Sequence, residues 1–586
     1  MDPNHLSDKA TGKARRPFVG TLLGCWLALL ASLGTTLVIY VLGVILPALS
    51  GILILESLGW AICGVGAAIL VIAWRRKQLG VLFTRSALVG YAWASVVLFS
   101  LVILFYGVER WRGKRAWMQC AQEIAAKGET LDLTSVRPPD VADEQNFAKI
   151  PQIAALLEAR KTDDGVWHRR DSATAHLGER LRKIQSRYRY DWDWQQEHTL
   201  NLTEWTDQFC EATGVVAPDS TMIPAARALS TLEPYGELLA AAQRACERPY
   251  ARFPVDLKRD RYYGNYQHLV VMRALSELLS VRAVAELDLG RSDAGLEDVR
   301  AGLHLAALAR QEPFWGSSYA LAPLHLWPMQ PLWEGLARQR WSETQLAALQ
   351  AELARHQPLA HYAPFLRAQC LYLINVLEQL TPSRQVSGES SFSGLESVDR
   401  VAVMLIRGVH PVGWAHLSQA AICRFYWQWA AVVEADRHQV NLSLAKRRIS
   451  APSPDPLYLV FFLPRIEELA HTEPHAVAYA QTVVDFASVA CALERYRMSQ
   501  GQPPAGLDSL VPTWIAQIPP DVCTGRPLAY QLVPDGQYRL YSFGWNGVDD
   551  GGKAALAPDW QGRLEPRLRE GDWTWGYAGI AGSNSN

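Results

Sequence analysis

The sequence predicts a mostly α-helical membrane protein, in which three N-terminal transmembrane helices carry a large helical region and a small C-terminal α+β domain with an antiparallel sheet. Three observations predict this class. Long apolar stretches occupy most of the first 107 residues. Apolar residues then recur at three- and four-residue spacing as far as about residue 380. After Ala478 the pattern changes to one helix and several short β-like runs separated by Asp, Asn and Gly.

Three apolar stretches are each long enough to cross the hydrocarbon of a bilayer. Phe18–Leu46 and Ser86–Tyr106 contain no charged residue, and Gly51–Trp74 contains one, Glu56. We expect Glu56 to reach the membrane interface because it lies only a few residues into its span. The first stretch is too long for a signal-peptide core and is followed at once by another apolar stretch. We therefore expect it to remain in the mature protein.

Basic residues flank the spans and predict the topology of the chain. They are Lys9, Lys13, Arg15 and Arg16 before the first span, Arg75, Arg76, Lys77 and Arg85 between the second and the third, and Arg110, Arg112, Lys114 and Arg115 after the third. The first two groups favour the cytoplasmic side, so an odd number of spans places the region after Tyr106 outside the cytoplasm. The third group favours the opposite orientation.

Charge and cysteine usage limit the classes of partner and site. The formal net charge is −1, which predicts no nucleic-acid partner because such proteins carry a basic surface. The nine cysteines occur singly, without a CxxC pair, so a structural zinc site is not predicted. Seven of them lie outside the first two spans, and an odd number cannot all pair within one chain. We predict mostly buried thiols, with a disulfide framework as the alternative.

The helical region contains one well-marked hairpin. Apolar periodicity predicts helices over Met272–Leu289 and Ala294–Leu308. Gly290 suits the C-cap of the first helix, and Ser292 or Asp293 suits the N-cap of the second. The hairpin resembles a single tetratricopeptide-type unit, but it does not recur at the period that a solenoid needs.

Other boundaries follow from caps and prolines. Ser342 and Gln345 have the spacing of a capping box, which predicts a helix from there to about His356. A short helix is predicted over Arg115–Ala126, before an extended connector at Pro138 and Pro139. The predicted parts are a tail 1–17, a transmembrane region 18–107, a connector 108–149, a helical domain 150–382, a Ser-rich linker 383–398, a helical segment 399–476 and an α+β domain 477–586.

The segment after Ala478 carries an ordered series of short motifs. They are Ala492-Leu493-Glu494-Arg495-Tyr496, Gly501-Gln502-Pro503-Pro504, Leu507 to Val511, Ile518-Pro519-Pro520-Asp521, Gly525-Arg526-Pro527-Leu528-Ala529-Tyr530, Leu540-Tyr541-Ser542-Phe543-Gly544, Asp549-Asp550-Gly551-Gly552 and Gly571-Asp572. In this order they resemble the C-terminal domain of the major pseudopilin of type II secretion systems. The resemblance implies a helix packed on a small antiparallel sheet.

The resemblance covers only the last part of the chain, and the apolar helix that follows a prepilin cleavage site in that family is absent. This predicts that the chain is not an ordinary assembled pseudopilin. The connector Leu131–Asn146 also resembles that of larger, uncharacterised bacterial membrane proteins that carry such a domain. Together these likenesses imply a protein of the bacterial inner membrane. The basic residues that flank the spans predict a cytoplasmic N-terminus and a periplasmic C-terminal region. Membrane lipid and secretion or pilus-like envelope proteins are the implied partners.

The resemblance also implies a calcium site at Asp549, Asp550 and Asp572. Major pseudopilins bind calcium in the loop after the Leu-Tyr-Ser strand, and calcium prefers carboxylate and carbonyl oxygens. The spacing to Asp572 departs from the family. The alternative is that Asn546-Gly547 and Asp550-Gly551 are turn residues that tolerate positive φ.

The sequence does not predict catalysis. It has no GxSxG, P-loop or HExxH signature. His471 and His475 have the spacing of metal ligands, but Pro474 is expected to interrupt the helix that would present them. We interpret two further kinds of group as structural. One is the pair of lone histidines His410 and His416. The other is the acid pairs Asp163-Asp164 and Asp191 with Asp193, which have the residue types of a glycosidase site but no other feature of one.

The 22 tryptophans suggest the alternative function. Trp192, Trp194 and Trp205, or Trp573 and Trp575, could stack on the sugar rings of an envelope glycan, or they could fill the hydrophobic core. We predict a membrane-tethered envelope protein that acts by binding or assembly and not as an enzyme. An envelope glycan-binding protein or hydrolase is the alternative.

Overall fold

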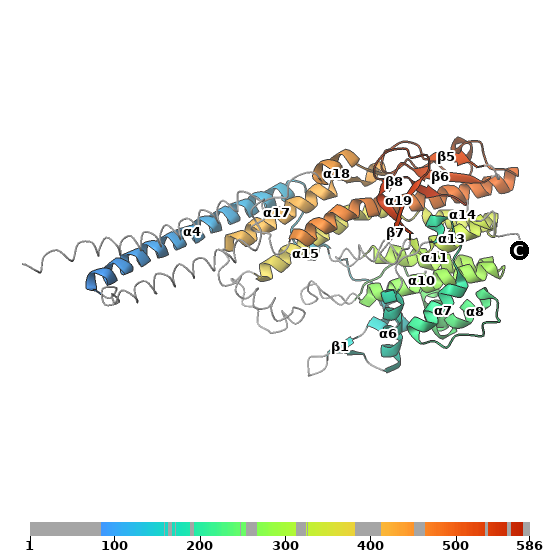
Figure 1. Cartoon of the computed structure of the whole chain (residues 1–586), viewed down its shortest axis with the longest axis horizontal. Coiled ribbons are helices and arrows are strands. Elements are labelled where there is room, and N and C mark those ends of the chain that lie inside the picture. The colour runs from blue at the N-terminus through green and yellow to red at the C-terminus, as the bar shows by residue number, and fades with distance from the viewer. Residues whose placement is uncertain are drawn as a thin grey trace, which may run out of the picture. The chain divides into compact units, whose positions relative to one another are not determined.

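The described part of the chain is mostly helical, with small antiparallel sheets near the C-terminus (Figure 1), as the sequence predicts. The structure is a computed structural model. It describes residues 84–136, 138–157, 159–161, 167–169, 172–187, 193–245, 248–253, 267–311, 324, 326–380, 412–449, 463–533, 537–558 and 564–577. The first two predicted spans, Glu56 and the linker 383–398 lie outside these residues.

Helix α4 spans Arg85–Ala125 without a break. It contains both the third predicted span, Ser86–Tyr106, and the helix predicted for Arg115–Ala126, so the prediction of two separate helices is wrong. The intervening basic residues are good helix formers, and no proline ends the helix between the two parts. The helix ends where Gly128, at φ 77°, donates its backbone N–H to the carbonyl of Ala125 at 2.9 Å.

The described residues fall into two compact units. The first holds α4 as far as Met118, the start of α17 (Val412–Ala430) as far as Ser418, and the start of α19 (Leu463–Gln500) as far as Ile466. The remaining described residues form the second unit.

In the first unit, α4 and α17 approach each other at two glycines. A Cβ atom on Gly413 would lie 1.9 Å from the carbonyl oxygen of Glu109, and one on Gly113 would lie 2.0 Å from the carbonyl oxygen of Gly413. The indole of Trp414 donates to Glu109 Oε2 at 2.9 Å. Because only a hydrogen side chain fits at this crossing, the two glycines permit the close approach.

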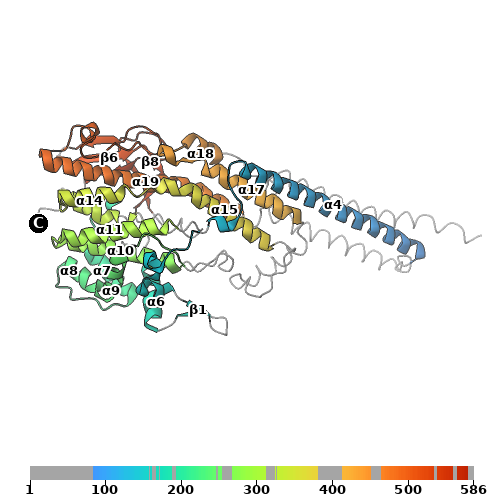
Figure 2. The same ribbon diagram turned by 180° about the vertical axis from the view of Figure 1, so that it is seen from behind.

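The second unit is built largely from helices that lie side by side (Figure 2). Their bounds are α5 Pro151–Leu157, α6 Ser172–Arg187, α7 Leu202–Thr213, α8 Pro224–Leu232, α9 Gly236–Arg244, α10 Gln267–Asp288, α11 Ser292–Ala309, α13 Met329–Ala337, α14 Glu343–Leu353, α15 Tyr362–Leu380 and α18 Leu442–Ile449. The core of this helical part gathers around α10, whose residues from Met272 to Leu279 are largely buried.

The predicted hairpin is confirmed as α10 and α11. Gly290 follows α10 at φ 77°, as a glycine C-cap requires. The N-cap of α11 is Arg291, so the prediction of Ser292 or Asp293 is wrong by one or two residues. Both side chains instead accept hydrogen bonds from the Gln345 amide, at 3.1 and 2.6 Å.

The capping box at the start of α14 is confirmed. The Ser342 hydroxyl accepts from the backbone of Gln345, and the Gln345 side chain accepts from the backbone of Ser342 at 2.9 Å. The same Gln345 amide therefore joins the N-terminus of α14 to that of α11.

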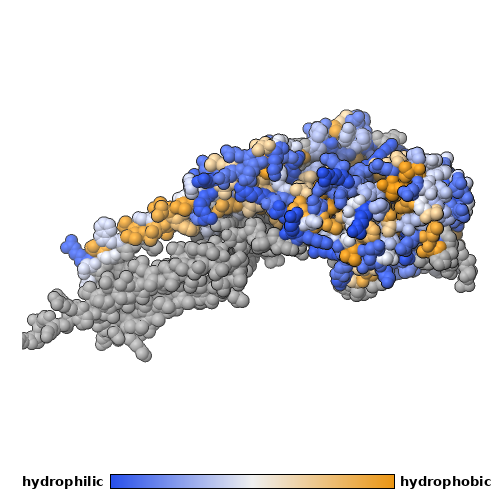
Figure 3. All heavy atoms as spheres, turned by 90° about the horizontal axis from the view of Figure 1, so that it is seen from above, coloured by the Kyte–Doolittle hydropathy of each residue, from blue (hydrophilic) through white to orange (hydrophobic). Residues whose placement is uncertain are grey.

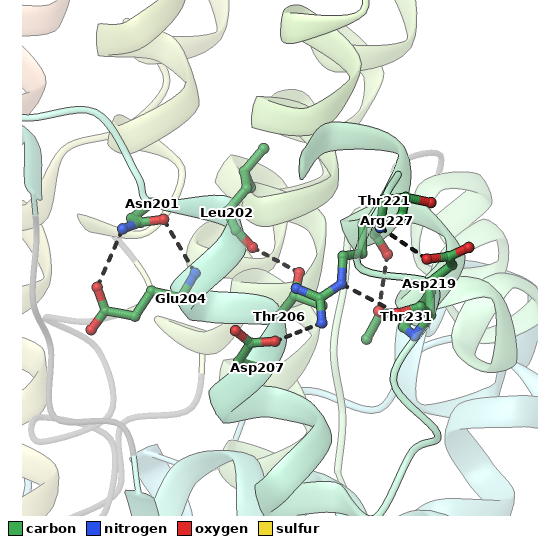
Figure 4. A network of polar contacts seen from close by, with 10 residues as sticks. Asn201, Leu202, Glu204, Thr206, Asp207, Asp219, Thr221, Arg227 and Thr231 are labelled. Carbon is green, nitrogen blue, oxygen red and sulfur yellow. Dashed lines mark hydrogen bonds and ion pairs between the residues drawn. The ribbon is translucent and has the colours of Figure 1, made fainter. Parts of the chain in front are cut away.

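A second polar network fixes α7 against α8 (Figure 4). Asn201 caps α7 by accepting from the backbone N–H of Glu204 at 3.2 Å. The buried guanidinium of Arg227 donates to Asp207 at 2.6 Å and to the carbonyl of Pro218 at 3.4 Å. These contacts satisfy a buried charge within the protein, so we interpret the network as structural.

The C-terminal part follows the predicted order of a helix and then a sheet. Helix α19 contains Pro474 and runs through the predicted boundary at 476/477, so the expectation that Pro474 interrupts the helix is wrong. A three-stranded antiparallel sheet has the order β5-β6-β9, with β5 Ala529–Leu532, β6 Tyr538–Ser542 and β9 Trp573–Trp575. Strands β7 (Ala554–Pro558) and β8 (Leu564–Gly571) form a separate antiparallel pair.

Shorter elements complete the described part. Two small hairpins pair β1 (Ala159–Lys161) with β2 (Trp167–Arg169) and β3 (Val433–Glu434) with β4 (Gln439–Val440). Short 3-10 turns occur at Leu133–Val136, Asp143–Gln145, Phe147–Lys149, Asp193–Gln196, Glu233–Tyr235, Pro358–His361, Ala435–Arg437 and Leu507–Leu510.

The C-terminal sheet shares a core with the helical region. The buried indole of Trp333 donates to the carbonyl of Gly576 at 2.9 Å and stacks on Tyr577 at 5.7 Å between ring centroids. Trp194 packs against Trp575 at 5.1 Å. Residues predicted to belong to two domains, 150–382 and 477–586, therefore bury each other's aromatic side chains within the second unit.

One helical stretch among the described residues is long and apolar enough to cross a membrane by length and composition, Pro474–Gln500. Its most apolar part is 83% buried inside the protein, with side chains such as Phe486 and Val489 fully enclosed. We interpret this stretch as the core helix of the second unit. The apolar stretch of α4 includes side chains that lie outside the described residues.

Candidate functional site

The candidate calcium residues lie around the loop that follows β6. This loop turns through glycines at positive φ, namely Gly544, Gly547, Gly551 and Gly552. Strands β7 and β8 follow the loop and lead the chain back to Asp572, the residue before β9. Strand β9 pairs with β6 through Ser542 and Trp573. The structure thus brings Asp549 and Asp550, on the loop, to the same place as Asp572.

Asp572 is the buried centre of this arrangement, with 1% of its surface exposed. Its Oδ2 atom accepts hydrogen bonds from the backbone N–H groups of Asp550 at 3.0 Å and Gly552 at 2.7 Å. Its Oδ1 atom is buried and has no hydrogen-bond partner in the described part of the chain. Oδ2 therefore holds the loop by hydrogen bonds, and Oδ1 can still accept a hydrogen bond or bind a cation.

The two loop carboxylates are more exposed than Asp572. Asp549 Oδ1 accepts from the backbone N–H of Gly551 at 3.0 Å, and Asp550 Oδ2 accepts from the Asn546 amide at 3.2 Å. Asn546 also accepts from the backbone N–H of Val548, which closes an Asx turn. The prediction of turn residues is confirmed for Gly547 and Gly551, which have positive φ.

The electrostatics of the loop favour a cation. Burial raises the pKa of Asp572, the two backbone N–H groups lower it, and the neighbouring carboxylates of Asp550 and Asp549 raise it again. Burial likewise raises the pKa of the Tyr541 hydroxyl, as do Asp549 and Asp572. A positive ion near these oxygens would relieve the repulsion among the three carboxylates.

The oxygen atoms at this loop are of the kind that calcium binds, but the carboxylate side chains do not converge on one point. The free Oδ1 of Asp572 and the carbonyl groups of the glycine-rich turn are ligands that calcium accepts. Among the described residues, however, no three His, Cys, Asp or Glu side chains converge closely enough to hold a metal ion. Calcium binding at Asp549, Asp550 and Asp572 therefore remains a prediction.

Sequence reasoning missed a buried acid in the helical core. Glu277, on α10, is 3% exposed, and burial raises its pKa to about 8 despite the nearby Trp205 indole and Arg273. A glutamate within the apolar pattern Met272–Leu289 is the sequence signal that could have identified it. The group lies inside the core, and we assign it no chemistry.

A second buried acid organises α13. Glu334 Oε1 accepts from the backbone N–H of Leu200 and from the Gln330 amide, both at 2.8 Å, and Arg338 lies 3.0 Å from Oε2. Burial raises the pKa of Glu334 to about 7. Because its partners are backbone and neighbouring helix residues, Glu334 holds the chain near Leu200 in place.

The prediction of buried thiols is confirmed for the described cysteines. All six are free and buried, namely Cys120, Cys210, Cys370, Cys423, Cys491 and Cys523. The thiol of Cys423 lies between those of Cys120 and Cys370, on helices α17, α4 and α15. Contact with Cys423 and burial raise the pKa of the Cys120 thiol, so the neutral form is favoured.

Four of the five tryptophans proposed for glycan stacking lie in the described part of the chain, and all four are inside the protein. Trp194, Trp205, Trp573 and Trp575 are each at most 3% exposed. Each of these rings contacts another aromatic side chain, and Trp205 stacks on Phe209 at 4.7 Å between ring centroids. They fill the core and cannot stack on a sugar ring.

Two of the histidines considered from sequence lie among the described residues. His475 is buried, with its ring 5.7 Å from that of Trp545, and His416 lies on α17. Asp163, Asp164, Asp191, Trp192 and His410, and the side chains of Asp193 and His471, lie outside the described residues.

Comparison with known protein families, with curated proteins and with solved structures found no match to this chain. The described part of the chain is mostly helical, with an exposed apolar helix and a C-terminal helix followed by a sheet.

Proposed function

We propose that this chain is a membrane-tethered protein of the bacterial envelope that acts by binding or assembly. Its N-terminus would lie in the cytoplasm, three helices would cross the inner membrane, and the region after Tyr106 would lie in the periplasm. Membrane lipid is one partner of this proposal, and envelope proteins of secretion or pilus-like systems are the other.

The observation that carries the proposal is the exposed apolar surface of α4. Large apolar side chains along this helix are each 45–70% exposed, namely Val89, Trp93, Val96, Val97, Phe99, Leu101, Val102, Ile103, Leu104 and Val108. They form a continuous hydrophobic surface along the helix (Figure 3). The stretch Ser86–Tyr106 carries no charge, and at about 1.5 Å per residue it is about 31 Å long, the thickness of a hydrocarbon core. Lipid is the solvent that suits such a surface.

The C-terminal part supports an assembly role. Helix α19 is followed by the antiparallel sheet β5-β6-β9, and Tyr479 of the helix contacts Trp573 of the sheet at 5.3 Å. This is the arrangement that the resemblance to major pseudopilins implies. Four of the five tryptophans named for the glycan-binding alternative are buried, which favours the assembly role over that alternative.

The proposed topology is tested by labelling a single introduced cysteine. Ser220 is exposed in the loop between α7 and α8. In spheroplasts, we expect Ser220→Cys in the full chain to react with a membrane-impermeant maleimide before lysis, because the loop would face the periplasm. The wild-type chain is the matched control, since its six described cysteines are buried. Labelling that occurs only after lysis would place the large region in the cytoplasm and refute the envelope role.

The assembly role is tested in the same cells. Chemical crosslinking of the tagged full chain, followed by purification in detergent, should recover defined envelope proteins in fixed proportion to the chain. An unrelated membrane protein of equal abundance, purified in the same way, is the control. The assembly role is contradicted if the chain is recovered alone, or if it recovers no more envelope protein than this control does.

The calcium site is tested by thermal unfolding of the full chain in detergent. If Asp572 binds calcium, calcium at about 100 times its dissociation constant stabilises the folded state by about 3 kcal/mol, and EGTA removes this effect. We expect Asp572→Asn to abolish the calcium-dependent shift, because asparagine keeps an acceptor for the two loop N–H groups but loses the charge. The control variant Asp508→Asn removes an exposed carboxylate outside the loop and should keep the calcium-dependent shift. A wild-type transition that does not respond to calcium would exclude the site.

A further inference from the structure

One face of α4 changes from apolar to basic beyond Tyr106. Arg110, Trp111, Lys114, Arg115 and Met118 are all exposed, and their spacing of three and four residues puts them on the same face. Trp111 and Met118 are 60% and 48% exposed. We call these five residues the basic-aromatic face. The opposite side of the helix, at Glu109 and Gly113, packs against α17.

The cations of this face have no acidic partner in the part of the chain that the structure describes. The structure shows no carboxylate paired with Arg110, Lys114 or Arg115 among the described residues. The guanidinium of Arg115 lies over the ring of Trp111, 5.4 Å from its centroid. By contrast, Arg112 points to the other side and pairs with the buried Glu109 at 2.6 Å. One cation therefore lies over an exposed indole, and all three cations are exposed and available to an anion from outside.

The face is continuous with the apolar surface of α4. Val89, Trp93, Val97, Leu104 and Val108 precede it at helical spacing, so the same side of the helix passes from hydrocarbon-like to aromatic and then basic. Figure 3 shows the hydrophobic stretch of α4 next to a hydrophilic one. Tryptophan and basic side chains in this order are typical of the level at which a membrane helix meets lipid headgroups.

We propose that the basic-aromatic face binds the headgroups of anionic phospholipids at the membrane surface where α4 leaves the bilayer. The inference rests on the proposed membrane tether and adds a lipid specificity to it. Arg110, Lys114 and Arg115 bind the phosphate groups, and Trp111 lies at the level of the ester bonds, where its ring is partly in hydrocarbon and its N–H reaches water. Because the charges are exposed, the attraction is screened by salt.

The test measures lipid binding to the purified full chain in detergent by native mass spectrometry. We expect the wild type to bind phosphatidylglycerol at least tenfold more tightly than phosphatidylcholine. The triple variant R110Q/K114Q/R115Q should lose about 100-fold in affinity for phosphatidylglycerol, since each basic residue near a membrane surface contributes about a fivefold factor. Its binding of phosphatidylcholine should not change.

The matched control is R437Q/K446Q/R447Q, which removes three exposed charges from the second unit and should keep the preference for phosphatidylglycerol. Equal binding of the two lipids by the wild type, an equal loss in both triple variants, or displacement of the lipid by millimolar inorganic phosphate would overturn the inference. Resistance of the chain to alkaline carbonate extraction is measured in parallel. If the chain resists extraction and shows no lipid preference, this inference fails while the membrane tether stands.

Discussion

Replacement of Glu277 by glutamine is expected to stabilise the protein at pH 8 by several kcal/mol. The pKa of Glu277 is raised from 4.5 to about 8 by burial, so the folded state keeps the proton that the unfolded state loses. Between these two pH values the wild type must therefore lose stability as the pH rises, by an amount on the order of 3–5 kcal/mol. Below pH 4.5 both states are protonated, and above pH 8 the loss is complete. Glutamine does not ionise and removes this dependence.

The measurement is chemical unfolding of the full chain in detergent at pH 5 and pH 8, followed by far-UV circular dichroism. Glu277→Gln should narrow the difference in unfolding free energy between the two pH values. Glu297→Gln removes a carboxylate that is 60% exposed on α11 and should leave the difference as in the wild type. If Glu277→Gln and the wild type lose the same stability between pH 5 and pH 8, Glu277 is not a buried protonated acid.

Truncation of Trp333 to alanine is expected to cost about 3–5 kcal/mol, the usual range for a fully buried tryptophan. The side chain has no exposed surface, donates a hydrogen bond to the carbonyl of Gly576 and stacks on Tyr577. Its removal leaves a cavity between the helical region and the C-terminal sheet. Both parts should therefore lose stability together, in one transition.

The two contributions of Trp333 can be separated by a second variant. Trp333→Phe keeps an aromatic ring against Tyr577 but leaves the Gly576 carbonyl without its donor, which should cost about 1–3 kcal/mol. Tryptophan fluorescence and far-UV circular dichroism are followed during unfolding in urea. A C-terminal sheet that unfolds at the same urea concentration in Trp333→Ala as in the wild type would show that the shared core does not stabilise it.

The candidate calcium residues illustrate how far a motif can predict a site. The order of the C-terminal motifs placed Asp549 and Asp550 on a glycine-rich loop, and the structure has them there. The sequence could not show that one oxygen of Asp572 already binds two N–H groups of that loop while the other has no partner. Those contacts depend on the backbone path through Gly551 and Gly552 and on the closeness of residues about 20 positions apart.

Local patterns in the sequence determined several elements correctly. The capping box at Ser342 and the glycine that ends α10 depend on hydrogen bonds within a few residues, so the sequence predicts them without knowledge of the fold. The mostly helical class and the C-terminal order of a helix and then a sheet follow from periodicity, which is also local. The boundary predicted at 476/477 differs from the structure, because α19 continues through Pro474.

Only the tertiary structure decided which side chains are buried against distant partners. Trp194 meets Trp575, Trp333 meets Gly576, and Glu277 lies within the core around α10. Each of these facts depends on residues brought together from far along the chain, and no local pattern distinguishes a tryptophan that stacks on a sugar from one that fills a core. The sequence by itself determined where helices and apolar surfaces form, since backbone hydrogen bonding and hydrophobic periodicity act over one or two turns. Burial, and with it the pKa of Glu277, arises only when those elements pack.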